Sequence, residues 1–391
     1  MSRLSTRSET PPFHVMDVLS SVAVRQQTHG DVVLLCVGQP STGAPARARE
    51  LAEEAVRSQV LGYTETAGNL ELRQAIAQHY DDWYGVPVAP EQVLLTTGSS
   101  AGFTALFLAA FDVGDQVVVT RPGYPAYRNT LHSLGCQVVD LDCGPDTRFQ
   151  PTVDLLDALP EKPAGLVLAS PANPAGTILA DPDLAAIAQW CEANDCLLIS
   201  DEIYHGIIYG TSAQTAWKSS REAAVVGSFS KYFSMTGWRL GWTLLPDHLL
   251  RPVEALLGNL NLCPPAISQA AALGVFSDSA RAELASHVAR YARNREVLLS
   301  RLPGIGVHDA TAPDGAFYAY VDISHLTDDS LAWCQQVLAA TGVAIAPGID
   351  FAPDGVGAPE LDGSRFVRFS FAGSEADIVE GFDRLSAYVA H

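Results

Sequence analysis

Short, almost continuously apolar runs alternate with helix-like patterns through the middle of the chain. Seven such runs have the length of a strand: EQVLLTT, DQVVVT, QVVDLD, AGLVLAS, CLLIS, AAVVGSFS and RLGWTLL. Helical patterns lie between several of them, near residues 100–111, 126–134 and 184–192. Strands that are apolar on both faces and separated by helices are typical of a mostly parallel sheet covered on both sides. The pattern therefore predicts an α/β architecture.

The pattern changes after Pro264. Helical periodicity covers residues 266–276 and 280–302, and the strand-like segments FYAYVDI and RFVRFSF follow in a shorter α+β tail. At 391 residues the chain is longer than one typical domain of roughly 100–200 residues. We therefore expect a large domain formed by residues 45–284 and a small domain formed by residues 1–44 together with residues 285–391.

Composition and charge exclude several classes of protein. Hydrophobic residues make up 48% of the chain and charged residues 17%, as is typical of a packed globular enzyme. The formal net charge of -20 disfavours binding to phosphate backbones and to anionic membranes. The sequence contains neither an apolar signal core at its start nor a run of about 18 apolar residues able to span a bilayer. We expect a cytoplasmic protein that binds neither nucleic acid nor membrane.

The cysteines give no sign of disulfides or of a metal centre. They are seven in number, contain no CxxC motif and lie mostly among apolar residues, at positions 36, 136, 143, 191, 196, 263 and 334. We interpret them as reduced core thiols. Since no Cys/His pair has zinc-ligand spacing, we expect no metal.

Lysine is scarce, so each lysine can be judged individually. Lys162 and Lys218 lie in polar turns, where a solvated charge is the simplest interpretation. Lys231 instead follows the strand-like run AAVVGSFS, and ligands of α/β sheets bind at the carboxyl ends of strands. A lysine that forms a Schiff base must be unprotonated near neutral pH, and burial beside another cation lowers its pKa from about 10.4. Arg239 is the candidate neighbour.

The segment SFSKYFSMTGWRLGW around Lys231 resembles the cofactor-lysine motif of class I and II aminotransferases, the fold-type I pyridoxal-phosphate enzymes typified by aspartate aminotransferase. Further pieces of the family pattern follow in order across nearly the whole chain. The resemblance implies a fold-type I transferase with a mostly parallel sheet in a large domain and a smaller α+β domain. It also implies that pyridoxal 5′-phosphate is held by Lys231 as a Schiff base.

Three further segments resemble the parts of the family that surround the cofactor ring. CLLISDEIYH implies that Asp201 accepts a hydrogen bond from the pyridine nitrogen and keeps it protonated, while Tyr204 contacts the phenolic oxygen. With Lys231, these are the expected catalytic residues. LVLASPANPAGT implies that Asn173 contacts the same oxygen and a substrate carboxylate. RPGYPAY implies that Tyr124 stacks on the ring. The alternative roles of these residues are a helix N-cap for Asp201 and core packing for Tyr124.

The phosphate is expected to bind at the start of a helix. LLTTGSSAGFTALF predicts a strand, a glycine turn and a helix N-terminus, where free amides and the helix dipole favour an anion. We assign Ser99 and Ser100 to this site, although alone they would be ordinary caps. Ser228 and Arg239 match family phosphate ligands, and a guanidinium can bind a phosphate with two bonds. GYTETAGNLELRQAI resembles the segment whose tyrosine, Tyr63, reaches the phosphate of a neighbouring subunit, which implies a homodimer with shared active sites.

The substrate carboxylate has two expected partners. RFVRFSFA matches the family's carboxylate motif at Arg368, whose planar fork suits a carboxylate. Strand alternation would put Arg365 on the opposite face. VGQPSTGAP resembles the strip beside bound substrate, with Gly38 as a backbone contact.

The resemblance implies ping-pong transfer of an amino group from an L-amino acid to a 2-oxo acid. A carbon–sulfur β-lyase, an aminocyclopropane-carboxylate synthase or a racemase would use the same lysine, aspartate and arginine and is the alternative. A regulator with an aminotransferase-like domain is not expected, because the pattern starts by about Val37 and leaves no space for a DNA-binding domain. No second basic residue for a distal carboxylate can be aligned, which favours a neutral or aromatic amino donor.

Overall fold

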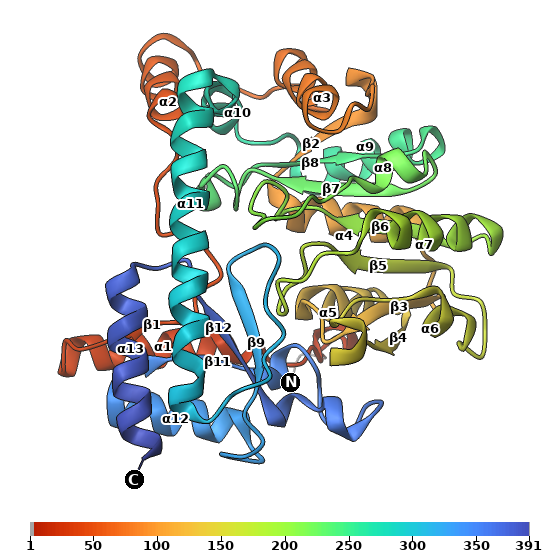
Figure 1. The fold of residues 1–391 in the computed structure, drawn as a ribbon. Coiled ribbons are helices and arrows are strands. Elements are labelled where there is room, and N and C mark those ends of the chain that lie inside the picture. The colour runs from red at the N-terminus through yellow and green to blue at the C-terminus, as the bar shows by residue number, and fades with distance from the viewer. Residues whose placement is uncertain (1–3, 391) are drawn as a thin grey trace.

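Seven strands form the central sheet, in the order β2-β8-β7-β6-β5-β3-β4 (Figure 1). The computed structural model describes residues 4–390. The strands are β2 (Val93–Thr96), β3 (Gln116–Arg121), β4 (Gln137–Asp142), β5 (Gly165–Ala169), β6 (Leu197–Asp201), β7 (Ala224–Ser228) and β8 (Gly241–Leu244). Strands β4, β3, β5, β6 and β7 pair in parallel, whereas β8 is antiparallel to both β7 and β2. The predicted α/β fold with a mostly parallel sheet is confirmed.

The antiparallel direction of β8 has a physical reason. Parallel neighbours need a long crossover, usually a helix, between them. The chain between β7 and β8 contains only the short 3-10 turn Thr236–Trp238, so it returns antiparallel. This short return carries Lys231.

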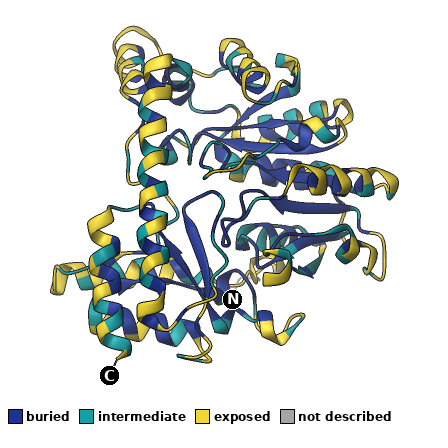
Figure 2. Ribbon diagram, in the orientation of Figure 1, coloured by how far each residue is buried: buried dark blue, intermediate teal, exposed yellow. Residues whose placement is uncertain are grey.

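Helices cover both faces of the central sheet, and this explains why its strands are apolar throughout. Alternate residues of one strand belong to different cores: Val118 packs on one face, Val117 and Val119 on the other. One face is covered by α4 (Gly98–Ala110), α5 (Pro125–Leu134) and α9 (Asp247–Asn261), the other by α6 (Val153–Asp157), α7 (Asp181–Ala193) and α8 (Ala216–Ser219). Figure 2 shows the strands buried and the outer helix faces exposed.

The expected helices form, with small differences at their ends. The pattern near residues 126–134 begins one residue earlier, at Pro125, because proline is tolerated in the first turn of a helix. The pattern over 266–276 is α10 (Ala266–Ala272) followed by a 3-10 turn, Leu273–Phe276. Two further helices, α2 (Ala46–Ser58) and α3 (Leu70–Tyr84), lie near α10 at one end of the molecule (Figure 1).

The segments from the two ends of the chain form a smaller α+β unit. Its antiparallel sheet has the order β11 (Ala346–Pro347), β12 (Phe366–Ser370), β9 (Tyr318–Asp322). Strand β1 (Val33–Leu34) pairs in parallel with β10 (Val343–Ala344), so the N-terminal segment joins the C-terminal region. The helices of this unit are α1 (His14–Thr28), α12 (Ser330–Thr341) and α13 (Glu375–Val389).

One long helix, α11 (Asp278–Arg301), runs from the end near α2 and α10 to the smaller unit (Figure 1). Residues 284 and 285, where we expected the domain boundary, both lie inside this continuous helix. The division of the chain at these residues stays a prediction.

The seven cysteines are free thiols, and all except the half-buried Cys263 are buried. No helix within residues 4–390 is long and apolar enough to cross a membrane. The expected cytoplasmic location stays a prediction.

Candidate active site

A cavity of about 330 Å³ lies at the carboxyl ends of β5, β6 and β7. Ten of the residues that we predicted from the sequence line it: Gly38, Ser99, Ser100, Tyr124, Asn173, Asp201, Tyr204, Lys231, Arg239 and Arg368. Ser228 and Tyr63 do not line it. The chain therefore brings most of the candidate residues together, as expected when parallel strands end at one edge of a sheet.

Lys231 lies just beyond the end of β7 and projects into the cavity. Its Nζ donates a hydrogen bond of 2.5 Å to the carbonyl oxygen of Gly38 and lies 5.8 Å from the centre of the Tyr204 ring. Burial, together with the cations Arg368 and Arg239, lowers the pKa of Lys231 to about 8, although the charge of Asp201 opposes this shift. Arg239, our expected neighbour, contributes less than Arg368. A substantial fraction of the amine is therefore neutral near pH 8.

Asp201 is the last residue of β6 and is buried. Its Oδ1 accepts a hydrogen bond of 3.1 Å from the Ile203 amide, and its Oδ2 accepts one from the Tyr127 hydroxyl. Burial raises the pKa of Asp201 to about 6, while the bonds from Tyr127 and Ile203 and the charge of Lys231 lower it. The carboxylate is therefore mostly ionised at neutral pH despite its burial.

Arg368 lies in β12, in the smaller unit, and is held on several sides. Its Nη1 donates to Asn173 Oδ1 at 2.9 Å and its Nη2 to the Cys36 carbonyl at 2.7 Å. The guanidinium lies 4.3 Å from the centre of the Tyr318 ring and 4.8 Å from that of Phe351. These contacts fix its plane, and its buried Nε has no hydrogen-bond partner among the described residues.

Gly38 lies close to the side chains of Tyr318 and Arg368. A Cβ at this position would lie 2.7 Å from the Tyr318 hydroxyl and 3.8 Å from Arg368 Nη2. The bare backbone therefore runs directly beside the arginine and accepts the bond from Lys231. Arg365, in contrast, lies in a 3-10 turn before β12, where its Nη2 is 3.7 Å from an Asp322 carboxylate oxygen.

The first turn of α4 and Arg239 form the cationic end of the cavity. Ser99 and Ser100 occupy this turn, where backbone amides have no acceptor within the helix. Gly98 has a φ of +73°, and a Cβ there would lie 2.5 Å from Arg239 Nη2. The guanidinium can therefore lie against the turn only because residue 98 has no side chain. This end presents amides, hydroxyls and one cation to the cavity.

Two predicted residues lie elsewhere. Ser228 is buried at the end of β7, where its Oγ accepts a hydrogen bond of 3.1 Å from the Ser230 amide. Tyr63 is 86% exposed between α2 and α3 and lies outside the cavity of its own chain. The phosphate role of Ser228 and the partner role of Tyr63 stay predictions.

Two tyrosines of the cavity were missed by the sequence analysis. Tyr127 lies on α5 three residues after Tyr124, and this helical spacing was a usable signal that both face the cavity. Tyr318 begins β9, and its hydroxyl lies 2.7 Å from that of Tyr204. No local pattern indicates the Tyr318 contact, because it joins segments 114 residues apart.

Comparison with known proteins shows the family of this chain. The family described as aminotransferase class I and II matches residues 30–385. The valine–pyruvate aminotransferase of Mycobacterium tuberculosis is 51% identical over 389 residues, which cover 99% of this chain and 98% of that protein. The aspartate/prephenate aminotransferase of Thermus thermophilus is 31% identical over 391 residues, covering 99% and 98%. The crystal structure of an aminotransferase from Mycobacterium tuberculosis matches with a TM-score of 0.96 and 51% identity over 100% of both chains.

The chain therefore belongs to the class I and II aminotransferases. It is a transaminase of fold type I, an enzyme that transfers an amino group from an amino acid to a 2-oxo acid, as the sequence predicted. The alternative of a carbon–sulfur lyase on the same fold is not favoured.

Proposed function

We propose that this transaminase binds pyridoxal 5′-phosphate in the cavity and acts by a ping-pong mechanism as a homodimer with shared active sites. The observation that carries the proposal is the convergence of Lys231, Asp201 and Arg368, from three distant parts of the chain, on one cavity of about 330 Å³. An amine, a buried carboxylate and a carboxylate-binding guanidinium are the groups that this chemistry needs.

The residues around the cavity suit the aldehyde, the ring nitrogen and the phosphate of the cofactor. The amine of Lys231 can capture the aldehyde, and the ionised Asp201 can hold a proton on the pyridine nitrogen. The first turn of α4 and Arg239 supply amides and a cation for the phosphate. When bound, the cofactor supplies a ring that accepts the electron pair left at the substrate's α-carbon.

Proton transfer is assigned to Lys231. A general base works best when its pKa lies near the operating pH, and burial brings the pKa of Lys231 to about 8. Its Nζ takes the α-proton of the bound amino acid. Asp201 assists by keeping the ring nitrogen protonated, and Tyr204 by donating a hydrogen bond to the phenolic oxygen.

The substrate is oriented by its α-carboxylate. Arg368 binds this group with its planar fork, while Asn173 holds Nη1 of the arginine at 2.9 Å. Because Lys231 Nζ lies 2.5 Å from the Gly38 carbonyl, a carboxylate held beside Gly38 directs the α-carbon toward the base.

The homodimer is supported by an exposed apolar surface around Tyr63. Val60 is 97% exposed, Leu260 53% and Leu262 57%. The two segments lie side by side, since the Thr64 amide donates to Cys263 Sγ at 3.4 Å. Contiguous exposed apolar surface is typical of subunit interfaces. In the proposed dimer, Tyr63 reaches the phosphate end of the neighbouring cavity.

Replacing Lys231 tests the proposal, with Lys218 as the control because it is an exposed lysine on the short helix α8 and does not line the cavity. Lys231→Ala should lose both the visible absorbance of the lysine-linked cofactor and all transamination turnover, whereas Lys218→Ala should keep both. Retention of either property by purified Lys231→Ala would refute the assignment. Pyruvate and ammonia formed from a single amino acid without an acceptor would instead indicate lyase chemistry.

A further inference from the structure

One wall of the cavity has no role in the proposed chemistry. It consists of Phe13 and three residues of α1, namely Val15, Met16 and Leu19, which we call the α1 wall. All four side chains are apolar. Val15 is buried, and Met16 is 55% exposed, so the wall extends from the interior of the cavity to its open side.

The α1 wall borders the space between the ring site and the carboxylate site. On one side, Phe13 packs edge-on against Tyr124, with ring centroids 6.3 Å apart. Lys231, Asp201 and the first turn of α4 also line the cavity. An amino acid with its carboxylate on Arg368 therefore has the α1 wall as an apolar surface available to its side chain.

Asp350 connects the α1 wall to the carboxylate site. It is buried, and its two carboxylate oxygens each accept a hydrogen bond of 2.8 Å from an amide in the first turn of α1, those of His14 and Val15. The next residue, Phe351, packs on the Arg368 guanidinium at 4.8 Å. The adjacent residues Asp350 and Phe351 thus set the distance between the α1 wall and Arg368.

The segment that follows Asp350 is bound to the large domain. The Phe351 carbonyl accepts a hydrogen bond of 2.9 Å from the Gly123 amide, just after β3. Arg121, fully buried at the end of β3, donates to the Pro353 carbonyl at 3.1 Å and pairs with Asp362. Asp350 is therefore a fixed point for α1.

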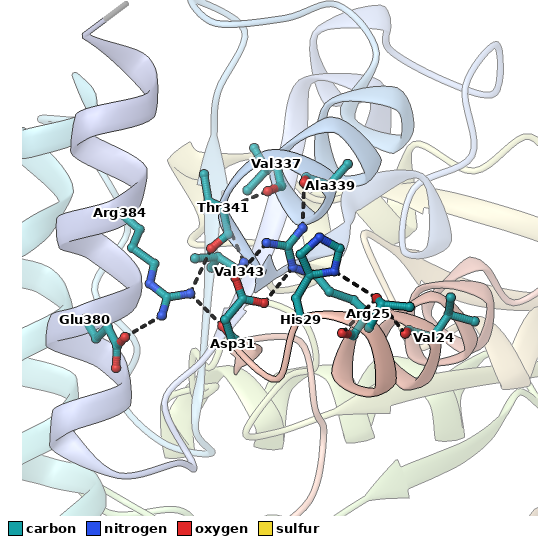
Figure 3. A network of polar contacts seen from close by, with 11 residues as sticks. Val24, Arg25, His29, Asp31, Val337, Ala339, Thr341, Val343, Glu380 and Arg384 are labelled. Atoms are coloured by element: carbon teal, nitrogen blue, oxygen red, sulfur yellow. Dashed lines mark hydrogen bonds and ion pairs between the residues drawn. The ribbon is translucent and has the colours of Figure 1, made fainter.

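The other end of α1 is held within the smaller unit (Figure 3). Arg25 donates to both carboxylate oxygens of Asp31, at 2.9 and 2.7 Å, and to the Ala339 carbonyl at 2.5 Å. Arg384 on α13 donates to the Asp31 carbonyl at 2.6 Å and to that of Thr341 at 2.8 Å. Polar contacts therefore hold both ends of α1.

Every charged side chain that this chain places around the cavity already has a role in the proposed chemistry. Its lining within the described residues includes the cations Lys231, Arg239 and Arg368 and the anion Asp201, and no other charged side chain. A distal carboxylate or ammonium placed on the α1 wall would lose its hydration without gaining a counter-charge from this chain, which is unfavourable. An apolar side chain would instead gain from burial there.

We propose that the α1 wall receives the side chain of a neutral, apolar amino acid, and that Asp350 is the positioning residue that sets this specificity. This inference rests on the proposed function, because it takes Arg368 as the carboxylate site. The names of the two relatives point to different substrate classes, since one names valine and the other aspartate and prephenate. The inference favours the apolar class.

The first test compares donors on the purified holoenzyme, using the loss of the visible absorbance in single turnovers. L-valine and L-leucine should react with a kcat/KM at least about a hundredfold above that of L-aspartate, since a charged group is strongly rejected by an apolar site. Equal rates for aspartate would overturn the inference and leave the proposed function intact. If no amino acid reacts although the cofactor is bound to Lys231, the proposed function itself fails.

The second test places a cation on the wall. Met16→Lys should raise the aspartate-to-valine ratio of kcat/KM by about tenfold or more. Val24→Lys is the matched control, because Val24 is exposed on the same helix but does not line the cavity. An unchanged ratio in Met16→Lys, or the same change in Val24→Lys, would contradict the role of the wall.

The third test removes one of the two carboxylate oxygens with which Asp350 accepts hydrogen bonds from the first turn of α1. Asp350→Asn should raise the KM for L-valine by about tenfold, the loss of roughly one charge-assisted hydrogen bond, with little change in cofactor affinity. Asp329→Asn is the control, because Asp329 caps α12 in the same unit by accepting from the Ala332 amide at 2.9 Å. Equal KM values for both variants would refute the positioning role of Asp350.

Discussion

Tyr127 donates a hydrogen bond to Oδ2 of Asp201, so the acid at the end of β6 is held by a phenol from α5. The Tyr127 ring also packs against Tyr124, with centroids 5.4 Å apart. One residue thus supports both the group that would stack on the cofactor ring and the group that would bind its nitrogen.

Tyr127→Phe should move the acidic limb of the kcat/KM profile to higher pH. The bond from Tyr127 stabilises the ionised carboxylate and opposes the burial that raises the pKa of Asp201 to about 6. A hydrogen bond to a charged group contributes about 1.5–3 kcal/mol, so its loss should raise this pKa by about one to two units. Tyr320→Phe is the control, because the buried Tyr320 hydroxyl has no hydrogen-bond partner among the described residues. An unshifted limb in Tyr127→Phe would rule out the proposed support.

Capture of pyridoxal phosphate by the cofactor-free enzyme should accelerate as pH rises, with a midpoint near pH 8, because only the neutral Lys231 amine is a nucleophile. Since the Arg368 charge lowers the pKa of Lys231 and the Asp201 charge raises it, Arg368→Gln should move the midpoint up and Asp201→Asn should move it down. Stopped-flow absorbance at a series of pH values measures both shifts. Shifts of the opposite sign would contradict the electrostatic assignment.

Gly98→Ala should weaken pyridoxal phosphate binding by at least about tenfold, because the new Cβ would lie 2.5 Å from Arg239 Nη2 and displace this cation. The backbone strain at the positive φ of residue 98 is reproduced by Gly85→Ala, since Gly85 has a φ of +63° and open space around its Cβ position. Equilibrium titration of the cofactor should detect the loss only in Gly98→Ala. A similar loss in both variants would mean that strain alone, and not the phosphate end, is responsible.

Subunits that carry different lesions should complement each other if Tyr63 acts across a dimer. A hybrid of a Lys231→Ala subunit and a Tyr63→Ala subunit contains one cavity with both residues intact. Mixed and reassociated subunits should therefore show more activity per cavity than either parent. Activity no higher than the mean of the parents would show that Tyr63 does not serve the neighbouring cavity.

Arg121→Leu should destabilise the protein by about 3 kcal/mol, because it leaves the carboxylates of Asp142 and Asp362 without their buried partner. Arg57→Leu breaks only an exposed pair with Glu53 and should change stability by less than about 1 kcal/mol. Denaturant unfolding of both variants measures the difference. Equal effects would mean that burial of Arg121 is unimportant for stability.

Much of the candidate site was predictable because its residues follow strands. Lys231, Asp201 and Asn173 come after runs that are apolar throughout, and parallel strands bring their carboxyl ends to one edge of a sheet. The positions of Ser99 and Ser100 follow from a local strand, turn and helix. The antiparallel β8 was less predictable, since its direction depends on the length of the return from β7.

By itself, the sequence determined the α/β class and the strand ends at which Lys231 and Asp201 lie, because these depend on hydrophobic pattern and local turns. The chemistry expected of the two residues follows from the family resemblance. Only the tertiary structure decided that Tyr127 supports Asp201, that Phe351 packs on Arg368, and that Asp350 holds the first turn of α1. The Asp350 contacts join residues more than 330 positions apart. Such contacts arise from the packing of distant segments against one another, and periodicity within a single segment carries no information about them.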